Sequence, residues 1–229
     1  MAKPLSDEAK QNIDDLIARA RAAQALINDF DQETIDRAVQ AVAWASANEK
    51  TFTRLAQLGV DESGLGDRAG RPYKRGKIIG ILRDCLRQKS VGVIEEIPEK
   101  GITKYGKPVG VIASLIPTTN PALTPPTNGL YSLKARNAMI FAPHPRSKQT
   151  TFEMVEVMRA GLKKVGFPED LFLCIQNPSI PTSQYLMSQA DLSIATGGPA
   201  MVQAAYSSGK PAYGVGAGNA TMCFDETTS

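Results

Sequence analysis

The stretch Gly110-Val-Ile-Ala-Ser-Leu-Ile-Pro-Thr-Thr-Asn-Pro121 decides the fold of this chain. Its residues 111–116 form an apolar run without alternation, which is the pattern of a strand buried on both faces. Four more short apolar runs follow, at residues 138–142, 171–175, 192–195 and 212–215. Segments of helical pattern separate these runs. The sequence therefore predicts an α/β fold with an open parallel sheet that helices cover on both faces.

The apolar pattern of residues 1–89, upstream of the sheet, predicts a set of amino-terminal helices. Ile13, Leu16 and Ala20 belong to an apolar stripe with the three-to-four spacing of an amphipathic helix. Asp31 offers a capping carboxylate to a second helical pattern, which continues to Gly59. A loop over residues 64–75, rich in glycine and charge, separates this pattern from a third helix at about residues 76–88.

Residues 90–108 predict an antiparallel β-ribbon between these helices and the sheet. Two strand-like runs, at residues 91–97 and 102–106, flank a turn at residues 98–101. A two-stranded ribbon is only marginally stable in water by itself. We therefore expect the ribbon to protrude and to pair with a neighbouring subunit, which makes the protein a homo-oligomer through residues 90–106. Residues 109–229 are expected to form a dinucleotide-binding α/β domain.

Composition excludes several classes of partner. The 26 Lys and Arg residues nearly balance the 23 Asp and Glu residues, so a net charge of +3 argues against nucleic-acid binding. No apolar run approaches the roughly 20 residues of a membrane span, and the start of the chain lacks the apolar core of a signal peptide. A 42% hydrophobic content is enough for a real core. We expect a cytoplasmic globular protein that binds small molecules.

The three cysteines do not form a metal or disulfide motif. Cys85, Cys174 and Cys223 are far apart, show no CxxC spacing and have no histidine nearby. We expect all three to be packing residues, with Cys223 in a strand-like run at residues 221–224. No metal site is predicted.

Chemistry is expected in the loops that follow the strands, because ligands of open parallel sheets bind at the carboxyl ends of the strands. Four of these loops have unusual sequences and should meet at one rim. The candidate residues are Thr118, Thr119 and Asn120 after the first strand, His144, Pro145 and Arg146 after the second, Thr196, Gly197 and Gly198 after the fourth, and Gly214, Gly216 and Gly218 at the fifth.

These loops suggest specific roles, each with a structural alternative. Gly198 precedes a proline at the start of a helix, where free amides and the helix dipole favour an anion such as pyrophosphate; an ordinary strand-to-helix turn is the alternative. His144 and Arg146 could hold a phosphate or a ribose. Asn120 could donate to a developing oxyanion, or it could simply form a turn before Pro121.

Taken together, these segments resemble the aldehyde dehydrogenase superfamily, and within it the CoA-acylating branch. Residues 110–121, 132–146, 195–199 and 205–219 carry the resemblance, in an order and spacing that match over roughly residues 90–225. The resemblance implies a Rossmann-like sheet of the aldehyde dehydrogenase type. The helical first ninety residues fit the amino-terminal region of that family.

The resemblance also implies a reaction. A cysteine thiolate attacks a short aldehyde such as acetaldehyde or sulfoacetaldehyde, hydride passes to NAD or NADP, and coenzyme A releases the acyl group from the thioester. Asn120 matches the family's oxyanion asparagine, and residues 196–198 match the turn beside the cofactor phosphates. His144 and Arg146 fall where hydrolytic relatives carry a lysine that holds the adenosine ribose.

Two departures from the family pattern refine this expectation, and the first concerns its hydrolytic members. Those enzymes carry the base of their water-activating step in a Glu-Leu-Gly-Gly motif, but residues 214–218 of this chain read Gly-Val-Gly-Ala-Gly. Without that base, acyl transfer to a thiol is the expected outcome. The family's nucleophile follows this loop by a few tens of residues, so Cys223 is too early. We expect the catalytic domain to be absent from this chain and the chain alone to be inactive.

Two other hypotheses remain open. A glutamyl-phosphate-reductase-like enzyme also works on an acyl group, but without coenzyme A; residues 118–121 and 144–146 argue against it. A non-catalytic assembly element that uses the ribbon to build a larger complex is the alternative from another class. Binding of NAD, NADP or coenzyme A separates these hypotheses, because a scaffold should bind none of them.

Overall fold

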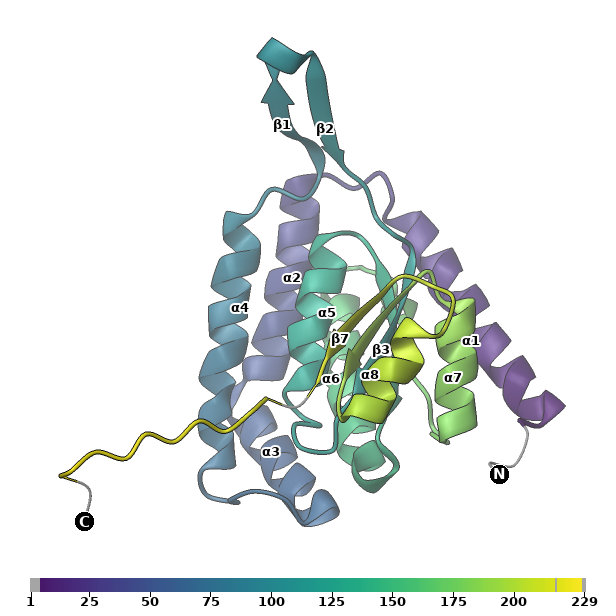
Figure 1. Cartoon of the computed structure of the whole chain (residues 1–229). Coiled ribbons are helices and arrows are strands. Elements are labelled where there is room, and N and C mark those ends of the chain that lie inside the picture. The colour runs from purple at the N-terminus through teal and green to yellow at the C-terminus, as the bar shows by residue number, and fades with distance from the viewer. Residues whose placement is uncertain (1–4, 217, 228–229) are drawn as a thin grey trace.

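A computed structural model describes residues 5–216 and 218–227 and shows one parallel sheet between layers of helices (Figure 1). Its five strands lie in the order β5-β4-β3-β6-β7. The α/β prediction is confirmed, with each strand within two residues of its expected place. The strands are β3 (Val111–Ile116), β4 (Ala138–Pro143), β5 (Phe172–Cys174), β6 (Leu192–Thr196) and β7 (Ala212–Val215).

The first strand of the sheet in chain order, β3, is also its central strand, and the later strands are added on either side of it. From β3 the chain adds β4 and β5 on one side, then returns to place β6 and β7 on the other side. Strand β3 pairs in parallel with both central neighbours, Val111 opposite Ala138 and Ile112 opposite Leu192. The strand order therefore reverses between β3 and β6, and a crevice at their carboxyl ends is where such sheets bind ligands.

Helices cover both faces of the sheet. On one face α5 (Thr124–Lys134) and α6 (Lys148–Lys164) pack on the strands, and α2 (Gln32–Ala47), α3 (Glu49–Ser63) and α4 (Arg75–Arg87) lie outside them. On the other face are α1 (Asp7–Leu26), α7 (Ile180–Gln189) and α8 (Pro199–Tyr206), as Figure 1 shows. Short 3₁₀ helices complete the chain: η1 (Arg71–Lys74), η2 (Pro98–Lys100), η3 (Pro145–Ser147) and η4 (Glu169–Leu171).

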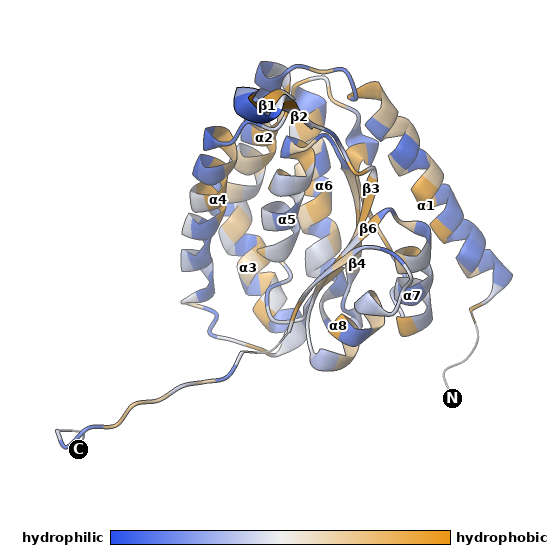
Figure 2. Cartoon of the chain, turned by 45° about the horizontal axis from the view of Figure 1, so that its top comes forward, coloured by the Kyte–Doolittle hydropathy of each residue, from blue (hydrophilic) through white to orange (hydrophobic). Residues whose placement is uncertain are grey.

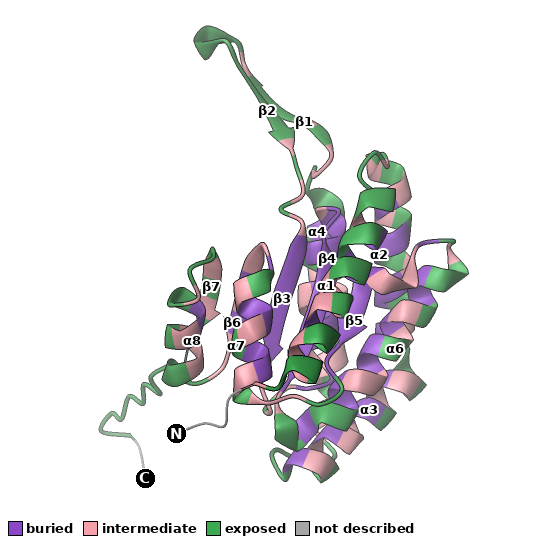
Figure 3. Cartoon of the chain, turned by 90° about the vertical axis from the view of Figure 1, so that its right-hand side faces the viewer, coloured by how far each residue is buried: buried purple, intermediate pink, exposed green. Residues whose placement is uncertain are grey.

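One hydrophobic core joins the amino-terminal helices to the sheet. Every residue of β3 and β4 is buried. Figure 3 shows β3 as a buried strand at the centre of the fold, and Figure 2 shows the same strand in the orange of apolar residues. Ile35 and Phe52 of the amino-terminal helices belong to the same buried cluster as Phe141 of β4. The amino-terminal helices and the sheet therefore share one continuous core in the described part of the chain.

The predicted second helix is in fact two helices. Asp31 caps α2 as expected, its side chain accepting from the Thr34 N–H. The helical pattern is interrupted at Asn48. Its non-helical backbone, with a ψ of 130°, ends α2, and its side chain accepts from the Thr51 N–H to begin α3. The apolar spacing runs through this break, so periodicity alone did not reveal it.

The predicted ribbon is present and projects from the body of the molecule (Figure 1). Strands β1 (Gly92–Ile97) and β2 (Ile102–Gly106) pair antiparallel, and both ends of the ribbon are fastened to the body. The Gln32 Oε1 accepts from the Ser90 N–H at 2.8 Å, and Arg136 donates to the Gly106 carbonyl at 2.8 Å. These contacts fix the direction in which the ribbon leaves the core.

Two cysteines pack as predicted and one does not. Cys85 and Cys174 are buried, but Cys223 is exposed and lies outside any strand. The expectation for Cys223 was wrong because its neighbours Met222 and Phe224 are also exposed and meet no core within the described part of the chain.

Among the described residues, no helix is both long and apolar enough to cross a membrane.

Candidate functional site

A cleft of about 640 Å³ opens at the crevice between β3 and β6. It receives side chains from the ends of β3, β4 and β6 and from the start of α7, and its size is typical of small-molecule sites. The predicted residues that line it are Thr118, Thr119, His144, Pro145, Thr196, Gly197, Gly198 and Gly216. The sequence argument that these loops meet at one rim is therefore confirmed in geometry.

The turn from β6 into α8 leaves the helix end open to the cleft. Gly198 occupies the N-cap position with an ordinary negative φ of −70°, and no side chain caps the helix. A Cβ built on Gly198 would meet nothing within 4 Å, so the space beside it is free. An open helix N-terminus with free space beside it can accept a phosphate group.

His144 faces the same cleft as a neutral hydrogen-bond donor. Its Nδ1 accepts from the Arg146 N–H at 3.1 Å, so the proton of the neutral ring is on Nε2. Burial, and then the nearby charge of Arg146, lower the pKa of the imidazole. At neutral pH the ring offers an Nε2–H donor and no charge, which suits a hydroxyl better than a phosphate.

Arg146 is turned away from the cleft. Its Nη2 donates to the carbonyl oxygen of Ser63, at the end of α3, over 2.7 Å. The neighbouring contact between Glu62 and the Thr150 N–H, at 2.9 Å, ties α3 to the start of α6 in the same way. In this arrangement Arg146 holds η3, the short helix to which it belongs, against the end of α3. It does not line the cleft.

Thr118 supplies an unused polar group. Its Oγ1 is buried and has no hydrogen-bond partner among the described residues. A buried hydroxyl without a partner is costly, so a ligand that bonds to it would be favoured. This hydroxyl and the free space at Gly198 are two features of the cleft that a polar ligand could use.

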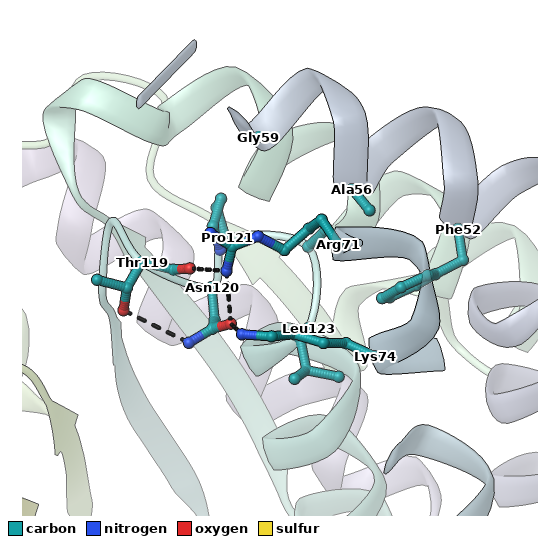
Figure 4. Close-up of a pocket in the computed structure, with 10 residues that line it drawn as sticks. Phe52, Ala56, Gly59, Arg71, Lys74, Thr119, Asn120, Pro121 and Leu123 are labelled. Carbon is teal, nitrogen blue, oxygen red and sulfur yellow. Dashed lines mark hydrogen bonds between the residues drawn. The ribbon is translucent and has the colours of Figure 1, made fainter. Parts of the chain in front are cut away.

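Asn120 lies in a small pocket beside the cleft (Figure 4). Its Oδ1 accepts from the Lys74 Nζ at 2.7 Å and from the Arg71 Nη1 at 3.2 Å. Its Nδ2 points the other way, toward the Thr119 Oγ1 at 3.5 Å, which is a weak contact. The side chain thus keeps N–H donor capacity for another oxygen.

The three candidate glycines of the last loop have different surroundings. Gly216 lines the cleft, whereas Gly214 lies in β7 under α8, where a Cβ would come within 2.5 Å of Val202. The absent side chain of Gly214 therefore allows close helix packing. Gly218 lies in the exposed extended segment that follows β7 and does not line the cleft.

Sequence reasoning missed the contribution of α7. Ser179 and Ser183 line the cleft, and Ser179 forms a reciprocal capping box with Thr182 at the start of that helix. A serine directly before a helical pattern is a recognisable N-cap signal. It could have placed the helix start at residue 180 and not at 182.

No cysteine of the described chain is an activated nucleophile in the cleft. Burial raises the pKa of the Cys85 thiol to about 11 and also raises the pKa of Cys174. Cys223 lies in the exposed segment after β7. Within residues 5–216 and 218–227, no group of His, Cys, Asp or Glu side chains is able to hold a metal ion.

Comparisons with known proteins agree with this geometry. The model of the aldehyde dehydrogenase family matches residues 3–215. A sulfoacetaldehyde dehydrogenase from an Acholeplasma species is 47% identical over 211 residues, which are 92% of this chain and 44% of the relative. The chain therefore spans about half the length of the curated relatives it matches.

Solved structures give the same result. An acetylating aldehyde dehydrogenase from Geobacillus thermoglucosidasius superimposes with a TM-score of 0.88 at 36% identity, covering 93% of this chain and 47% of that one. The propionaldehyde dehydrogenase of Rhodopseudomonas palustris with bound propionyl-CoA has a TM-score of 0.76 at 30% identity, covering 90% and 46%. An engineered glycolyl-CoA reductase with bound NADP⁺ gives 0.75 at 29%, covering 90% and 47%.

Proposed function

Because the chain belongs to the aldehyde dehydrogenase family, we propose that it is the cofactor-binding half of a CoA-acylating aldehyde dehydrogenase. The single observation that carries this proposal is the cleft at the β3/β6 crevice, with a partnerless Thr118 hydroxyl and open space at Gly198. The acetylating relative of the same fold supports the acylating assignment.

The nicotinamide cofactor, NAD or NADP, would occupy this cleft and accept hydride from the substrate. The open end of α8 at Gly198 would receive its pyrophosphate, and the Thr118 hydroxyl would donate to one of its oxygens. The neutral His144 ring would donate from Nε2 to a ribose hydroxyl. Arg146, in η3, would support the site through its bond to the Ser63 carbonyl at the end of α3 and is not required to touch the cofactor.

Asn120 would provide the oxyanion donor of the reaction. Its Nδ2–H is directed away from the cations that hold its Oδ1, as Figure 4 shows. A preorganised N–H aimed at the oxygen where charge develops stabilises the transition state of acyl transfer. We assign the nucleophilic cysteine and the aldehyde pocket to the part of the relatives that this chain does not cover. That part would set the aldehyde, whether acetaldehyde or sulfoacetaldehyde.

Coenzyme A would be the acyl acceptor. Residues 214–218 carry no carboxylate that could activate water, and Gly214 serves the packing of α8 on β7. Without a general base, a thioester reacts slowly with water and remains available to a thiol. The reverse reaction, from acyl-CoA to aldehyde, is then also accessible.

We further propose that residues 90–106 join two copies of the enzyme and that residues 109–229 form the nucleotide-binding unit supported by residues 1–89. The buried, unbridged Cys85 and Cys174 suit a reducing compartment, and we place the enzyme in the cytoplasm.

Calorimetric titration of the chain with NAD, NADP and coenzyme A tests the proposal. A cofactor-binding half should bind at least one of the two nicotinamide cofactors. A scaffold element should bind none of the three, and that result would overturn the assignment.

A further inference from the structure

Two cations converge on one side-chain oxygen at the edge of the cleft. Lys74 and Arg71 come from η1, 46 and 49 residues from Asn120 in sequence, and both donate to its Oδ1. The other acceptors of Arg71 are the carbonyl oxygens of Thr119, at 2.7 Å, and Leu65, at 2.9 Å. In the described chain, all the hydrogen-bond partners of these two cations are neutral oxygens, so their charge is not cancelled by a bonded carboxylate.

The loop before η1 is shaped to hold Arg71 in this place. Gly66 has a φ of +95°, and a Cβ there would lie 1.8 Å from the Arg71 Nη2. The glycine therefore serves both the left-handed backbone and the space that the guanidinium occupies. An arginine seated against a glycine and held by three carbonyl-type oxygens is a fixed part of the structure.

This contact determines which way the Asn120 carboxamide faces. Its oxygen accepts from two cations, and rotating the group by half a turn would place its NH₂ against an ammonium and a guanidinium, which have donors only. That repulsion excludes the flipped orientation. Charge-assisted bonds to a carbonyl oxygen also draw electrons from the amide nitrogen and make its N–H a better donor.

We propose that Arg71 and Lys74 are positioning residues for Asn120, which fix and polarise its carboxamide so that Nδ2–H faces the reacting oxygen. The inference rests on the proposed role of Asn120 as oxyanion donor. Arg71 and Lys74 touch neither substrate nor cofactor and act only through the Asn120 Oδ1.

The size of the pocket argues against a different use of the two cations. The cavity beside Arg71, Lys74 and Asn120 measures about 10 Å³, the lower limit for one water molecule. A carboxylate or sulfonate on the substrate has no room there. The cations therefore serve the protein's own amide and not an anionic aldehyde.

The first test measures the carboxamide itself, in this chain and without catalysis. Heteronuclear NMR of isotope-labelled protein compares the side-chain NH₂ of Asn120 in the wild type and in Lys74→Met, with the signal assigned through Asn120→Asp. Removing the ammonium should move the nitrogen resonance upfield and speed rotation about the C–N bond. Lys74→Arg, which keeps a cationic donor, should preserve both properties. An unchanged Asn120 signal in a folded Lys74→Met protein, or in Lys74→Gln if Met is not tolerated, would overturn the proposal.

The second test uses the longer enzyme, which combines this chain with its catalytic half. Asn120→Ala should lower kcat by about a hundred- to a thousandfold, as loss of one oxyanion donor does. Lys74→Met should lower kcat by ~10-fold with little change in the cofactor Kd, and the double variant should be no slower than Asn120→Ala alone, since both act through one group. Additive losses would contradict positioning.

Two other outcomes separate the remaining explanations. A Lys74→Met enzyme whose KM rises for succinate semialdehyde but not for propionaldehyde, at unchanged kcat, would make Lys74 a substrate anion site and overturn the inference. An Asn120→Ala enzyme with normal turnover would instead remove Asn120 from the proposed function, whatever the NMR shows about its orientation.

Discussion

The backbone N–H of Arg146 donates to the Nδ1 of His144 at 3.1 Å, and this bond links the charge state of the ring to the shape of the cleft. The bond requires an unprotonated Nδ1. Protonation of the ring turns that acceptor into a second donor and breaks the contact. The lowered pKa of His144 expresses the same preference for the neutral form.

The free energy of unfolding should therefore depend on His144 in a defined pH window. In the unfolded chain the ring takes up a proton near its ordinary pKa of about 6.5, while the folded protein resists protonation to lower pH. Stability is unaffected above the unfolded pKa and falls as pH drops toward the folded value. Urea unfolding at about pH 7.5 and about pH 5.5 should show this loss in the wild type and less of it in His144→Asn. His144 is the only histidine of the chain. If the free energy of unfolding fell by the same amount between the two pH values in both proteins, the effect would be refuted.

Gly198→Val should weaken cofactor binding without unfolding the protein. The residue has a φ of −70° and its Cβ would enter free space, so the fold tolerates a side chain there. That same space is where the pyrophosphate is proposed to lie, and we expect the Kd for the cofactor to rise by at least ~10-fold. Gly80→Val in α4, another glycine with an unobstructed Cβ, is the matched control and should bind normally. Equal affinities would remove the β6–α8 turn from the site.

NAD should bind more tightly than NADP. None of the residues that line the cleft in the described chain is lysine or arginine, His144 is held neutral, and Arg146 is bonded to Ser63. The additional phosphate of NADP would meet no fixed cation, and desolvating it without one is unfavourable. Parallel calorimetric titrations give the two Kd values directly. A lower Kd for NADP would show that Arg146 or another cation moves into the cleft on binding.

Assembly of the longer enzyme should depend on the ribbon. Ile102 and Tyr105 of β2 expose 45% and 60% of their surface, although both ends of the ribbon are fastened to the core. Apolar side chains on a rigid arm suit a partner surface. Tyr105→Lys should shift the enzyme toward monomer in light scattering, whereas Leu26→Lys, an equally exposed apolar position on α1, should not. A dimer that persists in Tyr105→Lys and in an Ile102→Lys variant would argue against the ribbon.

The features that could be predicted from the sequence, the strands and the loops of the cleft, are those that depend on local sequence pattern. The continuous apolar run at residues 111–116 and its four successors gave the strands, and the loop chemistry at Gly198 and His144 gave the cleft. The order of the strands was not predicted, because all five runs look alike and only packing decides their neighbours. The partners of Asn120 and Arg146 come from residues 46 to 83 positions away, and no local pattern carries that information.

The products made by the longer enzyme test the central claim most directly. It should be incubated with an aldehyde and NAD, with and without coenzyme A, while acyl-CoA and free acid are both quantified. Because residues 214–218 lack the base that activates water, a factor of about a hundred to ten thousand in rate, the account predicts acyl-CoA when coenzyme A is present and little free acid in either case. Rapid release of free acid without coenzyme A would contradict the acylating assignment and leave only the family and the fold standing.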